Sequence, residues 1–259
     1  KLNLKEDEEF YEVSIEGKKS LKLYVHKETL KLDYQLSGIS ILKEQAGYTA
    51  IENDLKVSFV NDSSEHFTGL GHSYFGRSKS IDLKGKLHNR NYGSHEQEQA
   101  PLIVPFYMSS KGYGIFMNST YENYFNFGEE GKYEFGINTS GFKGQMDYFF
   151  ILGPSIKGVL QEYVSLTGKP RLPQKSIFGL QLSDKGHDHN SSTPSNEQWW
   201  KDKIASHKAA GFPLDHVVND NRWRAGGGKR CESYIEWDKG RYPNPKAYKK
   251  WLEEQGLTS

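Results

Sequence analysis

The chain has 259 residues, with 34 lysines and arginines against 33 aspartates and glutamates, so its formal net charge is +1. This balance argues against nucleic acid as a partner, because a nucleic-acid-binding face needs a basic excess. A single cysteine, Cys231, excludes an internal disulfide and a thiolate metal cluster. No run of about 18 apolar residues occurs, so no membrane span is predicted.

The first 150 residues show the alternation of apolar and polar residues that is typical of antiparallel strands. Apolar side chains take every second position over 21–25 and again over 30–36, with a polar turn between, which predicts a hairpin. Many short strands without intervening helices predict a β-sandwich. Further strands are expected at 55–59, 113–118, 124–127, 132–136 and 147–152, with a hairpin turn at 128–131.

After Ser155 the spacing of apolar residues becomes helical, and Gly168 ends the predicted helix. Two prolines, Pro170 and Pro173, then discourage regular structure. We therefore expect a domain boundary here, with one domain over 1–170 and a second over 171–259.

The second segment alternates short apolar runs with helical patterns, which predicts parallel α/β winding. Ser195 and Gln198 have the spacing of a capping box, and Asn244 followed by Pro245 is a second helix start. Two strands and a stub cannot close a sheet, so we expect the chain to be truncated inside this domain. The expected order is a strand over 177–182, a helix ending at Gly211, a strand over 214–218, a helix ending at Gly256 and a strand start at 257–259.

Polar groups follow both predicted parallel strands, at the edge where parallel barrels carry their active sites. Asp220 offers two acceptors to sugar hydroxyls, Arg222 and Arg224 offer donors, and Trp223 offers a flat apolar face. Asp184, after the first strand, could contact the ligand or cap the loop that follows. The structural alternative for Asp220 is likewise a loop cap.

Neither a metal nor a cofactor is predicted. His187 and His189 lack a further clustered ligand, so they are interpreted as solvated residues. Residues 226–230 (GGGKR) lack the spaced glycine and the hydroxyl residue of a phosphate loop, which favours a mobile loop.

Several ordered motifs resemble glycoside hydrolase family 31, whose members include α-glucosidases and α-xylosidases. The segment 105–116 (PFYMSSKGYGIF) is the most diagnostic, because it is similar to a hairpin of that family. The other similar segments are 69–72 (GLGH, where the family usually has a final Glu), 89–93 (NRNYG), 152–154 (LGP), 212–215 (FPLD) and 241–245 (RYPNP).

This resemblance implies a galactose-mutarotase-like β-sandwich followed by the truncated beginning of a (β/α)₈ TIM barrel. It also implies a retaining mechanism, with one Asp as nucleophile and another as acid and base. In the family both lie on later barrel strands, so we expect no catalytic residue up to Ser259 and an inactive fragment. Asp220 matches a residue that binds non-reacting hydroxyls, and Asn91 lies where the family often has an Asp.

Two departures from the family pattern concern the sugar. Arg222 and Asn91 each stand where glucosidases usually have an acid, and this change alters which hydroxyls can be bound. The sequence hypothesis is therefore a terminal α-N-acetylgalactosaminide or α-galactose-type glycan rather than an α-glucoside.

Three other interpretations stay open at this stage. The chain could be a non-catalytic carbohydrate-binding protein, or an enzyme-like scaffold without catalysis. Alternatively, Asp184 and Asp220 could themselves form a catalytic pair. A secreted or periplasmic location would suit a glycan-degrading enzyme, but the sequence assigns neither compartment nor oligomeric state.

Overall fold

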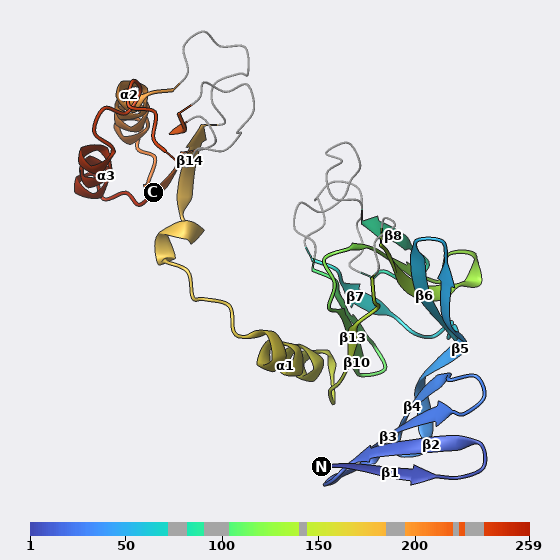
Figure 1. Cartoon of the computed structure of the whole chain (residues 1–259). Helices are drawn as coiled ribbons and strands as arrows, with labels where there is room; N and C mark the ends of the chain where they lie inside the picture. Colours follow the sequence, from blue (N-terminus) through green and yellow to red (C-terminus); the bar gives the residue numbers. More distant parts are fainter. Residues whose placement is uncertain (72–81, 91–103, 140–143, 185–194, 220–222, 226–235) are drawn as a thin grey trace. The chain divides into compact units, whose positions relative to one another are not determined.

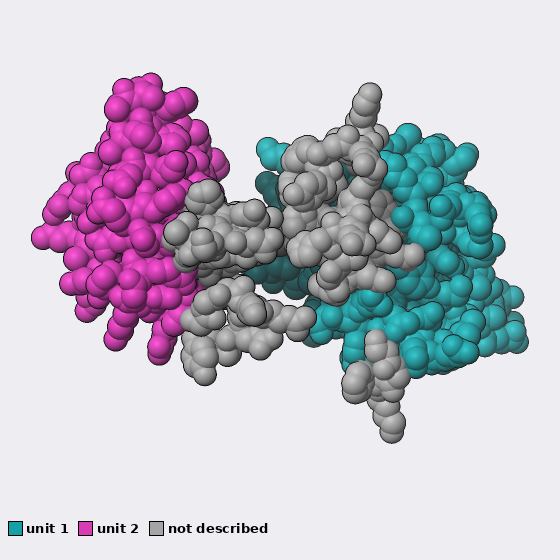
Figure 2. Space-filling view, turned by 90° about the horizontal axis from the view of Figure 1, so that it is seen from above, with its two compact units in different colours: residues 1–169 teal, residues 170–259 magenta. Residues whose placement is uncertain are grey.

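The computed structural model describes residues 1–71, 82–90, 104–139, 144–184, 195–219, 223–225 and 236–259. The chain divides into two compact units, residues 1–169 and 170–259, which are coloured separately in Figure 2.

Unit 1 consists mainly of two antiparallel sheets (Figure 1). In its described part, nine strands form one sheet in the order β1-β2-β3-β4-β5-β6-β12-β11-β8, and four form the other in the order β13-β10-β9-β7. The strands of the first sheet are β1 (Leu2–Glu6), β2 (Phe10–Ile15), β3 (Lys18–His26), β4 (Leu32–Leu36), β5 (Ile39–Ile51), β6 (Asp54–Phe59), β8 (Leu87–Arg90), β11 (Glu122–Phe127) and β12 (Tyr133–Asn138). Those of the second are β7 (Phe67–Gly69), β9 (Phe106–Ser109), β10 (Tyr113–Met117) and β13 (Tyr148–Leu152).

The expected hairpins are confirmed. Leu21 pairs with Leu36 and Val25 with Leu32, so β3 and β4 run antiparallel as the alternation predicts. Strands β11 and β12 pair around a short 3₁₀ turn, η1 (Glu129–Gly131). Side chains from both sheets form one buried cluster, which is rich in aromatic residues because strands favour them.

The Gly-Leu-Gly motif forms a strained turn. Gly69, Leu70 and Gly71 all have positive φ angles, of 135°, 64° and 86°. A Cβ on Gly69 would lie 2.5 Å from the carbonyl oxygen of Phe106, so only glycine allows this approach. The Leu70 amide donates to that same oxygen over 2.8 Å, and its side chain is buried.

Polar side chains of the 105–116 motif converge on one buried carboxylate. Glu65 is only 2 % exposed, and it accepts hydrogen bonds of 2.5 Å from Ser109 Oγ and from the Tyr113 hydroxyl. Lys111 Nζ lies 3.1 Å from its other oxygen. The Tyr113 hydroxyl also contacts that of Tyr133 at 2.8 Å. These residues thus stabilise the sandwich core, since a buried carboxylate needs such partners.

Helix α1 (Ile156–Thr167) closes unit 1 and packs on β9, β10 and β13. The helix begins where the change of period predicts, and Ser155 caps it by accepting from the Gly158 amide. Val159 is fully buried on this contact. Gly114 permits the contact, because a Cβ there would lie 2.7 Å from Val159 Cγ1.

Unit 2 has parallel α/β winding. The described strands β14 (Leu180–Asp184) and β15 (Leu214–Asn219) pair in parallel. Thr258 forms an isolated parallel β-bridge with His216 of β15. Helices α2 (Glu197–Ala209) and α3 (Pro245–Glu254) contribute Trp200, Ile204, Tyr248 and Leu252 to a separate buried cluster.

Two local predictions in unit 2 were wrong in detail. The predicted strand at 177–182 begins as a 3₁₀ turn, η2 (Lys175–Phe178), and becomes a strand only at Leu180. The cap of α2 is Asn196 and not Ser195, because Asn196 Oδ1 accepts from the Trp199 amide at 2.8 Å. Gln198 does not reach back either, since its amide donates to Asp202. Asn244 caps α3 as predicted.

Candidate active site

The carboxyl ends of β14 and β15 lie side by side in unit 2. Their register pairs Asp184 with Asn219, so the two predicted strand ends are at one edge of the sheet. The Asp184 side chain and the whole of Asp220 and Arg222 lie outside the described residues. Asn219 Oδ1 accepts a hydrogen bond of 3.3 Å from the Tyr248 hydroxyl, which fixes this strand end to α3.

The two faces of β15 have different surroundings. Val217 is 1 % exposed within the cluster formed with α2 and α3, and Asn219, two residues on, contacts α3. His216 and Val218 therefore belong to the opposite face, since side chains alternate along a strand. On that face His216 Nδ1 lies 2.7 Å from Thr258 Oγ1.

Trp223 is half-buried and packs within unit 2. Its ring centroid lies 4.9 Å from that of Trp237, and the Arg224 guanidinium lies 5.5 Å from the Trp223 ring centroid. Backbone pairing joins the two segments, because the Asp238 amide donates to the Trp223 carbonyl at 2.8 Å. The sequence led us to predict Trp223 as a flat face for a ligand, but it gave no sign that Trp237 would pack against it.

Arg224 is held through its backbone. Its carbonyl accepts from Arg241 Nη2 at 2.8 Å, and Arg241 Nε lies 3.0 Å from Asp238 Oδ2. Burial alone would raise the pKa of Asp238, but hydrogen bonds from the backbone and guanidinium of Arg241 outweigh it and lower the pKa. Arg224 Nε is buried and has no hydrogen-bond partner among the described residues.

The sequence analysis missed the supporting pair Asp238 and Arg241. The turn composition of residues 238–240 was the available signal. Asp238 Oδ1 accepts from the Gly240 and Arg241 amides, which closes a turn of this kind.

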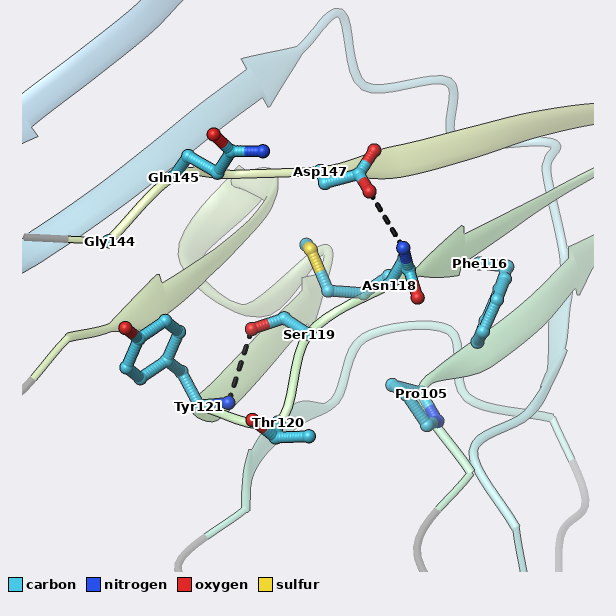
Figure 3. Close-up of a pocket in the computed structure, with 10 residues that line it drawn as sticks. Pro105, Phe116, Asn118, Ser119, Thr120, Tyr121, Gly144, Gln145 and Asp147 are labelled. Atoms are coloured by element: carbon cyan, nitrogen blue, oxygen red, sulfur yellow. Dashed lines mark hydrogen bonds between the residues drawn. The ribbon is translucent and has the colours of Figure 1, made fainter.

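Unit 1 has a pocket of about 640 Å³ between the start of β9, the turn after β10 and the segment before β13 (Figure 3). Asn118 Nδ2 donates to Asp147 Oδ2 at 2.7 Å, and Ser119 Oγ accepts from the Tyr121 amide at 3.1 Å. The residues that line it are Pro105, Phe116, Met117, Asn118, Ser119, Thr120, Tyr121, Gly144, Gln145 and Asp147. Hydroxyl, amide and carboxyl groups beside apolar surface suit a polyhydroxylated ligand.

Asn91, the site residue predicted in unit 1, lies outside the described residues. The strand that leads to it is described: β8 ends at Arg90, which pairs with Asn123 of β11. Tyr121 of the pocket precedes β11 by one residue, so the pocket lies near the end of β8.

The segments around His187, His189 and 226–230 also lie outside the described residues. In the part of the chain that the structure describes, no group of three histidine, cysteine or acidic residues could hold a metal ion. Among the described helices, none has the length and apolar character needed to span a membrane.

Comparisons with known proteins agree for both units. A family model described as the glycosyl hydrolase 31 N-terminal galactose mutarotase-like domain matches residues 1–126. A second, the glycosyl hydrolases family 31 TIM-barrel domain, matches residues 170–259. Together they cover most of the chain and confirm the predicted sandwich followed by part of a TIM-barrel domain.

Individual relatives come from the same family. The chain is 30 % identical to alpha-xylosidase XylQ of Lactiplantibacillus pentosus, over 86 % of this chain and 28 % of the relative. It is 26 % identical to an isomaltosyltransferase of Sporosarcina globispora, and that match covers 92 % of this chain and 24 % of the relative. The chain thus spans about a quarter of the length of these relatives.

A solved structure of the Flavobacterium johnsoniae GH31 dextranase, FjDex31A, complexed with glucose superposes with a TM-score of 0.80. The identity is 26 %, and the match covers 99 % of this chain and 30 % of that one. The two family models, the relatives and this structural match together show that the chain belongs to glycosyl hydrolase family 31.

Proposed function

We propose that the whole protein is a retaining, exo-acting α-glycosidase and that this chain supplies its sandwich domain, residues 1–170, and the first part of its barrel, residues 171–259. One observation carries the proposal: the parallel strands β14 and β15 end side by side, with Asp184 paired to Asn219. The unit that contains them matches a TIM-barrel family model. Barrel active sites form at that edge. The nucleophile and the acid/base belong to barrel strands after Ser259.

Asp220, Arg222, Trp223, Arg224, Asp184 and Asn91 are proposed as substrate-binding residues. The alternation of β15 supports this role for Asp220: a residue that continued the pattern would share the face of His216 and Val218, opposite the helices. Arg224 Nε, which is buried and has no hydrogen-bond partner in the described part of the chain, supports a ligand contact for that side chain. A carboxylate and a guanidinium together can hold several sugar hydroxyls in a fixed orientation.

Two hypotheses compete for the sugar. The departures at Arg222 and Asn91 favour an α-N-acetylgalactosaminide or α-galactose-type glycan. However, the relatives compared above are named for xylose and isomaltose, and the dextranase structure contains glucose. Since this dextranase structure superposes with a TM-score of 0.80 at 26 % identity, we favour an α-glucan with terminal α-glucose.

The test is hydrolysis of nitrophenyl α-glycosides by the full-length protein, with glucose, xylose, galactose and N-acetylgalactosamine as the sugars. We expect kcat/KM to be highest for the α-glucoside, with retention of anomeric configuration. A clear preference for the N-acetylgalactosaminide would reverse our choice of sugar. Inverted product or the absence of hydrolysis on every substrate would reject the retaining α-glycosidase.

A further inference from the structure

Unit 1 contains another pocket, of about 560 Å³, on the part of the large sheet formed by β2 to β5. Its volume lies within the range of about 300–1,000 Å³ that is usual for small-molecule sites. None of its residues belongs to the substrate-binding set proposed above. Its lining consists of Phe10, Tyr24, His26, Thr29, Lys31, Leu32, Asp33, Gln35, Lys43, Glu44, Gln45 and Val60.

Two aromatic rings form a rigid corner in this pocket. The Phe10 and Tyr24 rings are 6.1 Å apart and nearly perpendicular, with an interplanar angle of 83°. The Tyr24 hydroxyl donates to Glu12 Oε2 at 2.9 Å, and Lys22 Nζ holds the same oxygen at 2.8 Å. Because the ring is oriented by these bonds, a ligand that packs on it pays little entropy for ordering the site.

Charged groups of the pocket balance one another. Lys31 and Lys43 are opposed by Asp33 and Glu44, so the lining favours a neutral ligand over an anion or a cation. Burial raises the pKa of the Glu44 carboxyl above its ordinary value.

Hydrogen-bonding groups in the lining are of both kinds. Gln35 lies beside Asp33, to which its Nε2 donates at 2.8 Å, and its own carbonyl is an acceptor. His26 Nδ1 is buried and has no hydrogen-bond partner among the described residues, while its ring packs edge-on against Phe10 at 5.2 Å. These features suit a sugar as the ligand. The aromatic rings can pack against its C–H faces, and the donors and acceptors of the lining can bind its hydroxyl groups.

We propose that this pocket binds a neutral saccharide, with Tyr24 and Phe10 as the packing surface and Gln35 and Asp33 as hydroxyl partners. The site gives unit 1 a glycan-binding function of its own, beyond the hydrolysis proposed for the whole protein. A glycan bound there would keep the protein on its polymer between successive reactions.

The test is electrophoresis of the full-length protein through native gels that contain soluble dextran. Wild type is expected to be retarded, and Tyr24→Ala is expected to weaken the apparent affinity at least about tenfold, which corresponds to roughly 1.4 kcal/mol. Tyr24→Phe keeps the ring but loses the bond to Glu12, so its affinity should lie between those of wild type and Tyr24→Ala. Tyr48→Ala is the matched control, because Tyr48 is 55 % exposed on β5 and is not in the lining.

Gln35→Ala removes a polar group of the lining and leaves both rings in place, so it should weaken retardation several-fold. It is the second variant to measure if Tyr24→Ala fails to fold. An unretarded wild type, or retardation that is equal in wild type, Tyr24→Ala and Gln35→Ala, would overturn the inference. Hydrolysis of a nitrophenyl glycoside by the same preparations reports on the proposed function separately. A retarded but inactive protein would keep this site and reject the glycosidase.

Discussion

The Tyr248 hydroxyl donates a hydrogen bond to Asn219 Oδ1, which ties the last residue of β15 to the first turn of α3. Tyr248 is fully buried and Asn219 is half-buried. Tyr248→Phe should lower the free energy of unfolding by about 1 kcal/mol, because the Asn219 oxygen loses its donor. Urea unfolding measures this change. Tyr48→Phe, at an exposed site, should be neutral within about 0.5 kcal/mol; an equal loss in both variants would contradict the role of the bond.

Asp220 is the proposed residue whose role can be tested most sharply. In the full-length protein, Asp220→Asn should reduce kcat/KM by roughly 10²-fold, because two charge-assisted hydrogen bonds to sugar hydroxyls are weakened. Added azide should not restore the rate if Asp220 only binds the substrate. Rescue by azide with an inverted glycosyl azide product would instead identify a nucleophile. Asp202→Asn on the exposed side of α2 is the carboxylate control and should keep the wild-type rate.

Asn196 caps α2, so Asn196→Ala should destabilise the protein by about 1 kcal/mol. The physical reason is that the Trp199 amide loses its acceptor at the helix start. Asn196→Asp keeps an acceptor at the same place and should retain most of the stability. Thermal unfolding of the two variants decides the matter; the same melting temperature for Ala and Asp would mean that the cap contributes nothing.

Gly69 combines a positive φ angle with close backbone contact. Gly69→Ala should therefore cost more than the roughly 1 kcal/mol of left-handed strain alone, since its Cβ would lie 2.5 Å from the Phe106 oxygen. Gly17→Ala isolates the strain, because Gly17 has a φ of 82° and nothing within 4 Å of the added Cβ. Denaturant midpoints of the two variants give the difference. Equal losses would show that the close contact relaxes freely.

Glu44 predicts a pH dependence of stability. Burial raises its pKa above the usual 4.5, even though the Leu32 amide and the Tyr148 hydroxyl bond to the carboxyl. The folded state therefore binds this proton more tightly than the unfolded state does. Its contribution to stability is complete below the unfolded pKa and is lost as pH rises through the folded pKa.

Glu44→Gln cannot ionise, so it removes the loss of stability at higher pH, and its side-chain oxygen can still accept from the Leu32 amide. The variant should match wild type near pH 4 and have the higher melting temperature at pH 7. Melting curves across this range test the sign. The prediction would be wrong if the melting temperature of wild type rose relative to that of Glu44→Gln as the pH increased.

Much of the secondary structure follows from short-range patterns. The hairpin of β3 and β4 is encoded by apolar residues at every second position from Leu21 to Leu36, because one face of the sheet is buried. Helix α3 is encoded by Asn244 and Pro245 at its start. The family followed from motifs in a fixed order. At the start of α2, however, Ser195 and Asn196 are both good caps by residue type, and only the structure shows that Asn196 is the one used.

By itself, then, the sequence determined a strand-rich first unit, parallel winding in the second and membership of a glycosidase family. Tertiary structure alone brought Trp237 against Trp223, fourteen positions away, and collected Ser109, Lys111 and Tyr113 around Glu65. The reason is physical: periodicity and caps depend on hydrogen bonds within a few residues, whereas the partner of a buried ring or carboxylate comes from a segment that meets it only when the chain folds.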